Sequence, residues 1–328
     1  MMEVSTQKAL VMITGASRGY GLALAKAAAK KFNFPAHFCL IARSQDGLNK
    51  CKENVEQARS QHCPDMETSV ETKVLDLQDI DSLGSNLDAL FNEVSASNYC
   101  RGILFSNAGI IGYIGQTKGT GAGDALAALR AALDVNVVAA AMLAARFLGT
   151  FAAAAAEDAA AAAPAAPSAG GQEEEEEGAT QAQAQAAAAG RTPPPPSVLV
   201  GTSSLCAVRP FPTLAAYCMS KAAMDMMLGC AAAEHDPSVL KVLNWAPGPL
   251  MGTDMTAAVR AAAGEGGGLH PSLAGFYLGQ EGFIDVDVSA SACMDVLLNN
   301  EFTSGAHIDV YDVLPNNDVN KTLPQKEG

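Results

Sequence analysis

The sequence is poor in aromatic side chains and in positive charge. Aromatic residues make up 5% of the 328 residues, with a single Trp, and 21 Lys and Arg residues stand against 35 Asp and Glu, for a formal net charge of −14. Nucleic acids and anionic membranes are bound by basic protein surfaces. The charge balance therefore argues against both as partners and favours a small-molecule ligand.

Two further absences narrow the class of protein. The eight cysteines include no CxxC pair and have no histidine at ligand spacing, which argues against a zinc site. Scattered thiols are typical of a reducing compartment. No basic segment followed by a long apolar core begins the chain, and the alanine tract is broken by Glu157, Asp158 and prolines. We therefore expect a cytoplasmic protein with no secretory signal and no membrane span.

Strand-like and helix-like segments alternate along most of the chain. Strands are predicted over residues 8–13, 36–42, 68–75, 102–106, 197–204, 239–245 and 307–310, and helices over 20–31, 47–61, 79–95, 126–151, 214–234 and 288–298. Such alternation is typical of an α/β domain with a doubly wound parallel sheet and helices on both faces. We expect one such domain, built from residues 1–151 and 197–313 and followed by a polar tail, 314–328.

The segment 152–196 interrupts this alternation. It combines alanine runs, five glutamates at 173–177, alternating Gln and Ala, and four prolines at 193–196. The alanines could prolong the preceding helix, but the adjacent glutamates and prolines cannot form a core. We interpret the segment as a disordered insertion in a surface connection. Docking of a basic partner is the less favoured alternative, because charge runs are usually solvated.

A glycine-rich turn joins the first predicted strand to the first helix. It runs from Thr14 to Gly21 with the spacing TGxxxGxG. The first glycine permits a tight turn, the second allows backbone to approach a phosphate, and the third allows close packing of helix on strand. N–H groups at a helix N-terminus bind anions, so this turn is a candidate pyrophosphate site. Its candidate contacts are Gly15, Ser17, Arg18, Gly19, Tyr20 and Gly21.

The second strand ends in a basic rather than an acidic residue. An acidic side chain at this point would accept hydrogen bonds from the ribose 2′-hydroxyl of NAD. This chain has Arg43 there, with Arg18 nearby in the glycine turn, and two guanidinium groups suit a 2′-phosphate. Asp46 is interpreted as a helix N-cap. The pattern favours NADPH as the cofactor.

Tyr217 and Lys221 are four residues apart on a predicted helix and so lie on one face. A lysine charge ~4.5 Å away at an effective dielectric of ~20 would lower the tyrosine pKa by roughly 2.7 units, which would make Tyr217 a better proton shuttle. Ser204 lies at the end of the neighbouring strand, and only one of Ser203 and Ser204 can face the tyrosine. Asn136, inside a helix, is a further catalytic candidate; the alternative is an ordinary polar helix residue.

These motifs together resemble the short-chain dehydrogenase/reductase family. The resemblance rests on the glycine turn, on Asn107-Ala108-Gly109, and on Asn136, Ser204, Tyr217 and Lys221. It implies a single Rossmann-like domain in which Ser204 orients a carbonyl, Tyr217 is the acid/base and Lys221 binds the nicotinamide ribose. It also implies that Asn136 holds a water in the proton relay, and that the helix before the insertion forms a homodimer interface.

The resemblance assigns further cofactor contacts, some of them in a loop that closes over the cofactor. They are Asp76, Leu77, Asn107, Ala108, Gly109, Tyr217, Lys221, Pro247, Gly248, Leu250 and Thr253. The chain departs from the family pattern in two places. It has Ser106 where the family usually has a first asparagine before Asn107, and it carries one extra residue between Leu250 and Thr253.

Within this family the chain is most similar to the sepiapterin reductases. The similarity lies in residues 203–207, 217–218, 243–250, 253–255 and 301–312. It implies that Asp309 binds the amino-pyrimidine edge of a pterin, whose N–H donors a carboxylate matches; the alternative is a surface charge at a strand end. The predicted function is NADPH-dependent reduction of side-chain keto groups of sepiapterin or 6-pyruvoyl-tetrahydropterin, with Ser204, Tyr217 and Asp309 binding substrate. The alternatives are a broader carbonyl reductase and a non-catalytic NADPH-binding protein.

Overall fold

The computed structural model describes residues 8–94, 98–121, 123–162, 195–264 and 266–314. In this part of the chain seven parallel strands form one sheet in the order β3-β2-β1-β4-β5-β6-β7. The strands are β1 Lys8–Thr14, β2 Ala36–Ala42, β3 Thr68–Val74, β4 Tyr99–Ser106, β5 Ser197–Thr202, β6 Leu240–Ala246 and β7 Ala306–Asp309. The prediction of a doubly wound parallel sheet is confirmed.

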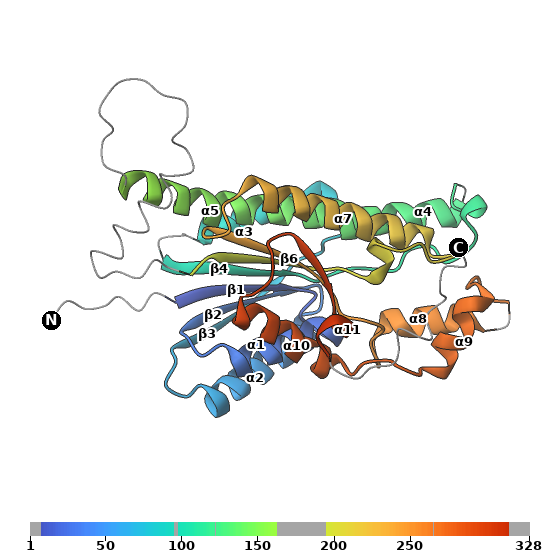
Figure 1. Cartoon of the computed structure of the whole chain (residues 1–328), viewed down its shortest axis with the longest axis horizontal. Coiled ribbons are helices and arrows are strands. Elements are labelled where there is room, and N and C mark those ends of the chain that lie inside the picture. The colour runs from blue at the N-terminus through green and yellow to red at the C-terminus, as the bar shows by residue number, and fades with distance from the viewer. Residues whose placement is uncertain (1–7, 95–97, 122, 163–194, 265, 315–328) are drawn as a thin grey trace, which may run out of the picture.

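Helices cover both faces of the sheet (Figure 1). One layer holds α1 Gly19–Lys31, α2 Gln45–His62 and α10 Val286–Asn299; the other holds α3 Ile80–Glu93, α4 Gly123–Leu133, α5 Ala140–Ala162 and α7 Ala215–Glu234. Strand β1 shows why both layers form, because its alternate side chains point to opposite faces. Val11 and Ile13 pack in the first core, and Leu10 and Met12 in the second. Strands buried on both faces read as continuous apolar runs.

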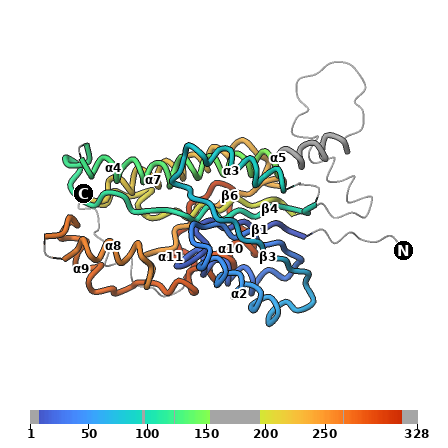
Figure 2. The backbone as a smooth tube through the Cα atoms, turned by 180° about the vertical axis from the view of Figure 1, so that it is seen from behind, coloured from blue at the N-terminus to red at the C-terminus, as the bar shows by residue number. Residues whose placement is uncertain are grey.

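The chain reverses its direction of travel across the sheet between β1 and β4. From β1 it moves outward through β2 to β3, then returns to β4 and moves outward the other way to β7. In open α/β sheets ligands bind in the crevice at the carboxyl ends of the strands that flank such a switch point. The tube view from behind shows α8 Asp254–Ala263 and α9 Pro271–Gly279 lying beyond that end of the sheet (Figure 2).

The structure differs from the expected elements in four places. The glycine-rich stretch 247–282, for which the sequence predicts no regular element, contains α8 and α9, and the four-residue helix α11 Val310–Val313 follows β7. Helix α5 extends to Ala162, so the alanines at the start of the predicted insertion are helical, whereas residues 163–194 lie outside the described residues. The helix expected over 126–151 is interrupted by a π-helical segment, Asp134–Ala139.

The stretch Gly123–Ala152 is helical throughout, with a mean hydropathy of 1.7 in its most apolar window. By length and composition alone it could cross a membrane, a property that core helices of globular domains share. Within the described residues its α5 portion contacts α3, α7 and β4. These contacts place it in one of the two helical layers.

Close packing of α5 on the sheet depends on a glycine in β4. A Cβ at Gly102 would lie 2.6 Å from Phe147 Cε2 and 2.7 Å from Phe151 Cδ2. The two rings contact each other at 5.1 Å between centroids and lie directly on the strand backbone. By contrast, a Cβ at Gly149 on the same helix would meet no atom of the described residues within 4 Å.

We predict opposite effects for the same substitution at these two glycines. Gly102→Ala overpacks the interface and lowers the free energy of unfolding by about 1–3 kcal/mol. Gly149→Ala raises it by about 0.5–1 kcal/mol, because alanine has the higher helix propensity. Urea unfolding followed by circular dichroism measures both. Equal effects at the two positions would contradict this account of the α5 interface.

Candidate active site

A cavity of about 900 Å³ lies at the carboxyl ends of the strands, where sequence analysis placed the site. Except for Asn136, all predicted site residues line it. They are Gly15, Ser17, Arg18, Gly19, Tyr20, Gly21, Arg43, Asp76, Leu77, Asn107, Ala108, Gly109, Ser204, Tyr217, Lys221, Pro247, Gly248, Leu250, Thr253 and Asp309. Asn136 is buried at 1% exposure and lies behind the cavity wall.

The glycine turn has the backbone geometry that its sequence predicts. Gly15 has φ 67° and Gly19 has φ 54°, both in the left-handed region that favours glycine. A Cβ at Gly21 would collide with the Gly15 carbonyl oxygen. The turn therefore leaves backbone exposed at the N-terminus of α1, a cradle that suits a pyrophosphate. Tyr20 belongs to this cradle through its backbone, because its side-chain hydroxyl accepts a hydrogen bond from Trp245 Nε1 at 2.7 Å.

Asn107 holds the turn to the neighbouring strands. Its side-chain nitrogen donates to the Thr14 carbonyl oxygen at 2.9 Å, and its backbone N–H donates to Thr14 Oγ1 at 2.9 Å. Ala108 N–H donates to the same hydroxyl at 3.0 Å. On the other side, Thr202 Oγ1 donates to Asn107 Oδ1 at 3.3 Å. Asn107 thus joins the ends of β1, β4 and β5, and its role in the structure is to shape the cofactor crevice.

At the end of β2 three cations and three carboxylates line the cavity, and each arginine faces a carboxylate. Arg43 Nη1 lies 4.0 Å from Asp76 Oδ1. The Arg43 side chain is more than half exposed, and the Asp76 side chain is nearly half exposed. Arg18 forms an ion pair with Asp254, the first residue of α8. Lys50 on α2 also lines this end, a contact that sequence analysis missed because no motif marks it. Arg18, Arg43 and Lys50 can make charge-assisted contacts to a phosphate, and Asp46, Asp76 and Asp254 line the same end.

Ser204, Tyr217 and Lys221 meet at the centre of the cavity. Ser204 lies close enough to Tyr217 to lower the pKa of the tyrosine hydroxyl, against the effect of burial, and its Oγ accepts from Cys206 N–H at 3.2 Å. Lys221 Nζ donates to the Thr202 carbonyl oxygen at 2.5 Å and lies 5.7 Å from the centroid of the Tyr217 ring. Ser203 points elsewhere, with its Oγ 3.5 Å from His307 Nδ1. Of the two adjacent serines, Ser204 is therefore the one that faces the tyrosine.

Burial shifts the pKa values of the tyrosine and the lysine in opposite directions. Tyr217 is 8% exposed, and burial raises the pKa of its hydroxyl well above the usual value. Burial lowers the pKa of Lys221 to about 8, opposed by the negative charge of Asp225. The expected lowering of the Tyr217 pKa by Lys221 does not appear, because the loss of hydration on burial dominates the shift.

Asn136 lies in the π-helical segment and binds the loop after β4. Its Oδ1 accepts from Ile110 N–H at 2.8 Å, and its Nδ2 donates to the Ile110 carbonyl at 2.8 Å and to Ser220 Oγ at 2.9 Å. Gly109 lets it approach Lys221, since a Cβ there would lie 3.1 Å from Asn136 Oδ1 and 3.6 Å from Lys221 Nζ. π-helical turns are frequent at functional sites. Asn136 thus joins the π-helical segment to the loop after β4 and to α7, and its catalytic role stays a prediction.

The far end of the cavity has an aromatic wall and one carboxylate. Phe276 and Tyr277 on α9 line it, and both pack on Phe283, with ring centroids 5.1 and 5.6 Å from it. Sequence analysis missed this wall because α8 and α9 carry no motif. Asp309 is 9% exposed, and burial raises the pKa of its carboxyl. Its Oδ1 also caps α11 by accepting from Tyr311 N–H at 3.1 Å.

The chemistry of these groups fits a nicotinamide cofactor and an organic carbonyl. In the described residues no group of three or more His, Cys, Asp or Glu side chains could hold a metal ion. The glycine cradle, the basic end and the buried Ser204–Tyr217–Lys221 cluster lie in one cavity. A serine, a tyrosine and a lysine so placed can bind a carbonyl oxygen and transfer a proton to it.

Comparisons with known proteins agree with this geometry. The family described as "short chain dehydrogenase" matches residues 9–159 and 195–264. Among curated relatives, the sepiapterin reductase of Xenopus tropicalis is 38% identical over 118 residues, and that of Meriones unguiculatus is 42% identical over 117 residues. Each alignment covers 35% of this chain and 42% of the relative, so the chain matches about two fifths of the length of these reductases.

Solved structures share the fold at low sequence identity. The KRED1-Pglu enzyme has a TM-score of 0.63 at 18% identity, and the match covers 92% of this chain and 100% of that enzyme. A putative gluconate 5-dehydrogenase from Beutenbergia cavernae with bound NADP has a TM-score of 0.63 at 20% identity, with 93% and 96% covered. The family match spans well over half of the 328 residues, and the observed fold agrees with it. The chain therefore belongs to the short-chain dehydrogenase family of oxidoreductases.

Proposed function

We propose that this chain reduces a side-chain keto group of a pterin of the sepiapterin or 6-pyruvoyl-tetrahydropterin type, using NADPH. The observation that carries the proposal is the position of Asp309. This carboxylate lines the same cavity as Ser204, Tyr217 and Lys221, at the end where Phe276 and Tyr277 form an aromatic wall. The similarity to sepiapterin reductases over about a third of the chain supports the same substrate class.

The chain's own groups bind the carbonyl and supply the proton. NADPH, when bound, supplies the hydride. Ser204 donates a hydrogen bond to the substrate oxygen, and Tyr217, whose raised pKa keeps it protonated, donates its proton to that oxygen. Lys221, held by the Thr202 carbonyl, places a positive charge that stabilises the tyrosinate left behind. Asn136 keeps the loop after β4 in place beside this cluster.

Asp309 provides the recognition that a simple ketone does not need. A pterin carries an amino group and a ring N–H on one edge, and a carboxylate accepts from both. The planar ring matches the aromatic wall, which gains from stacked or edge-on contacts. A neutral diketone has no such donors, so its binding does not depend on Asp309.

For cofactor choice, we predict that Arg43→Ala weakens NADPH binding and leaves NADH binding nearly unchanged. Loss of one charge-assisted contact to a 2′-phosphate costs about tenfold in affinity or more. Titration of protein fluorescence with each cofactor measures the two Kd values. Arg146→Ala is the matched control, because Arg146 pairs with Asp88 on α3 outside the cavity. A chain that binds NADPH and NADH equally before and after Arg43→Ala would refute the NADPH assignment.

For the substrate, we predict that Asp309→Asn raises KM for sepiapterin about tenfold or more and leaves KM for a simple diketone unchanged. Asparagine removes the charge but still caps a helix, so α11 is kept. Asp285→Asn is the matched control, since Asp285 caps α10 in the same way and does not line the cavity. Steady-state NADPH oxidation with both substrates gives the comparison.

Two other outcomes of these assays would support the alternative functions. Turnover of the diketone but not of sepiapterin by the unaltered chain would support the broader carbonyl reductase instead. NADPH binding with no turnover of either substrate would support a non-catalytic binding protein.

Tyr217→Phe is expected to abolish turnover of both substrates and to keep NADPH binding, because it removes the proton donor alone.

We infer that two copies of the chain pair through α4 and α5. Only a third of the most apolar window in Gly123–Ala152 is buried, and Val138 and Ala145 lie exposed on this helix. A second copy would cover this apolar surface. Sedimentation analysis is expected to give a dimer for the unaltered chain and a monomer for Ala145→Glu, which places a charge in the contact. A monomeric unaltered chain would exclude this arrangement.

A further inference from the structure

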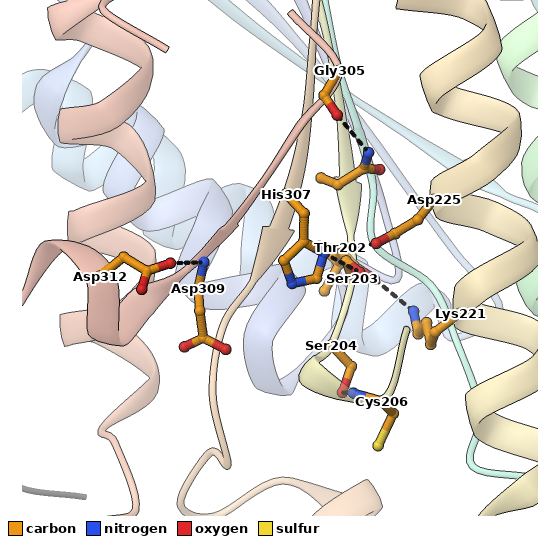
Figure 3. A network of polar contacts seen from close by, with 11 residues as sticks. Thr202, Ser203, Ser204, Cys206, Lys221, Asp225, Gly305, His307, Asp309 and Asp312 are labelled. Atoms are coloured by element: carbon orange, nitrogen blue, oxygen red, sulfur yellow. Dashed lines mark hydrogen bonds and ion pairs between the residues drawn. The ribbon is translucent and has the colours of Figure 1, made fainter. Parts of the chain in front are cut away.

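A partly buried pair of a carboxylate and an imidazole, Asp225 and His307, lies beside Lys221 (Figure 3). Asp225 follows Lys221 by one helical turn on α7, so both side chains lie on one face of that helix. His307 comes from β7, 82 residues further along the chain, and its Nδ1 lies 2.7 Å from Asp225 Oδ2. The side chains are 19% and 13% exposed for His307 and Asp225.

We propose that Asp225 and His307 are positioning residues for Lys221: the imidazole holds the Asp225 carboxylate one helical turn from the Lys221 ammonium, beside the proton-transfer cluster. The idea rests on the proposed reductase function, in which Lys221 acts on Tyr217. Neither residue lines the cavity, so neither touches the substrate or cofactor.

The first argument comes from groups that burial leaves unpaired. Asp225 Oδ1, His307 Nε2 and Asn244 Oδ1 are buried with no hydrogen-bond partner among the described residues. Asn244 and His307 are neighbours in register across β6 and β7, and His307 Nδ1 contacts Asp225 Oδ2, so the three unpaired atoms belong to residues that lie next to one another. An unpaired buried polar atom costs stability, and native proteins keep few of them. A cluster of three beside the active centre is therefore evidence of a functional role.

The second argument comes from the environment of Lys221. The side chain is buried at 2% exposure, and the Thr202 carbonyl is its one hydrogen-bond partner within the described part of the chain. Burial alone favours the neutral amine, and the Asp225 charge opposes this by raising the pKa of Lys221. Without Asp225, the lysine would lose its charge at a lower pH. The carboxylate is thus placed to preserve the charge that the cluster requires.

The charged and titratable groups around Lys221 come from four elements. Asp225 and Tyr217 lie on α7, and Cys206 lies on the 3₁₀ turn Leu205–Ala207 after β5. On β7, His307 and Asp309 are two residues apart and so point to one face, and Arg209 acts on Asp309 from the loop before α7. Among these groups Asp225 is the largest source of favourable charge at Lys221. The pair also joins α7, which carries Lys221, to β7, which carries Asp309.

The test follows the ionisation of Lys221 directly. Lysine labelled with ¹³C at the ε-carbon is titrated by NMR in the full-length protein without substrate, and Lys221→Arg assigns the resonance. We expect a midpoint near pH 8, because burial lowers the pKa of this lysine to about 8. Asp225→Asn should lower that midpoint by about one to two pH units. His307→Gln should shift it the same way by less, and Asp225→Glu should restore it.

Activity provides the second readout. Because a neutral lysine no longer supports Tyr217, the alkaline limb of kcat should move to lower pH by the same amount in Asp225→Asn, with KM little changed. Asp88→Asn on α3 is the matched control, since its carboxylate lies on the surface and pairs with Arg146. Thermal unfolding checks that each variant is folded. His307→Gln carries the test if Asp225→Asn does not fold.

The outcomes separate the two proposals. A Lys221 midpoint that is unchanged in folded Asp225→Asn, or in folded His307→Gln where the former does not fold, overturns the positioning role even if the unaltered chain is an active reductase. A shifted midpoint in a chain that reduces no carbonyl keeps the positioning role and overturns the proposed function.

Discussion

The geometry of the site depends on the contact between Thr14 and Asn107 at the switch point of the sheet. β1 and β4 are neighbours in space, although two strands and three helices lie between them in sequence. The hydrogen bonds from Asn107 to Thr14 hold the two carboxyl ends at a fixed separation, and Thr202 extends the contact to β5. The glycine turn, the cofactor crevice and the end of β5 that carries Ser204 all take their places from this junction.

Burial is the second organising constraint, because it sets the charge state of the central groups. The same desolvation raises the pKa of Tyr217 and lowers that of Lys221. Both shifts favour neutral forms, which is the wrong state for a lysine meant to stabilise a tyrosinate. The carboxylate of Asp225, one helical turn away, opposes the effect of burial by raising the pKa of Lys221. Asp225 in turn contacts His307 on β7, with Oδ2 lying 2.7 Å from Nδ1.

One side chain, Asp309, serves both the cavity lining and a helix cap at the aromatic end of the cavity. Asp309 caps α11 and at the same time faces the cavity beside the aromatic wall. The cap fixes the direction of the carboxylate, since one oxygen is held by Tyr311 N–H. A cavity-lining carboxylate that is also a helix cap is pre-oriented, which lowers the entropy lost when a ligand binds. The same helix, through Tyr311, is tied to the Gly282 carbonyl at the end of the α9 region.

The sequence by itself determined the features that depend on local spacing. The alternating strands and helices, the TGxxxGxG turn and the four-residue separation of Tyr217 from Lys221 require only the periods of strand and helix, and the structure places all of them as expected. Only the tertiary structure decided which distant groups meet. Asp225 and His307, the wall formed by α9, and the π-helical turn at Asn136 carry no local signal, and the direction of the Tyr217 pKa follows from burial. Burial is produced by segments far apart in sequence that pack together, so no short pattern of residues encodes it.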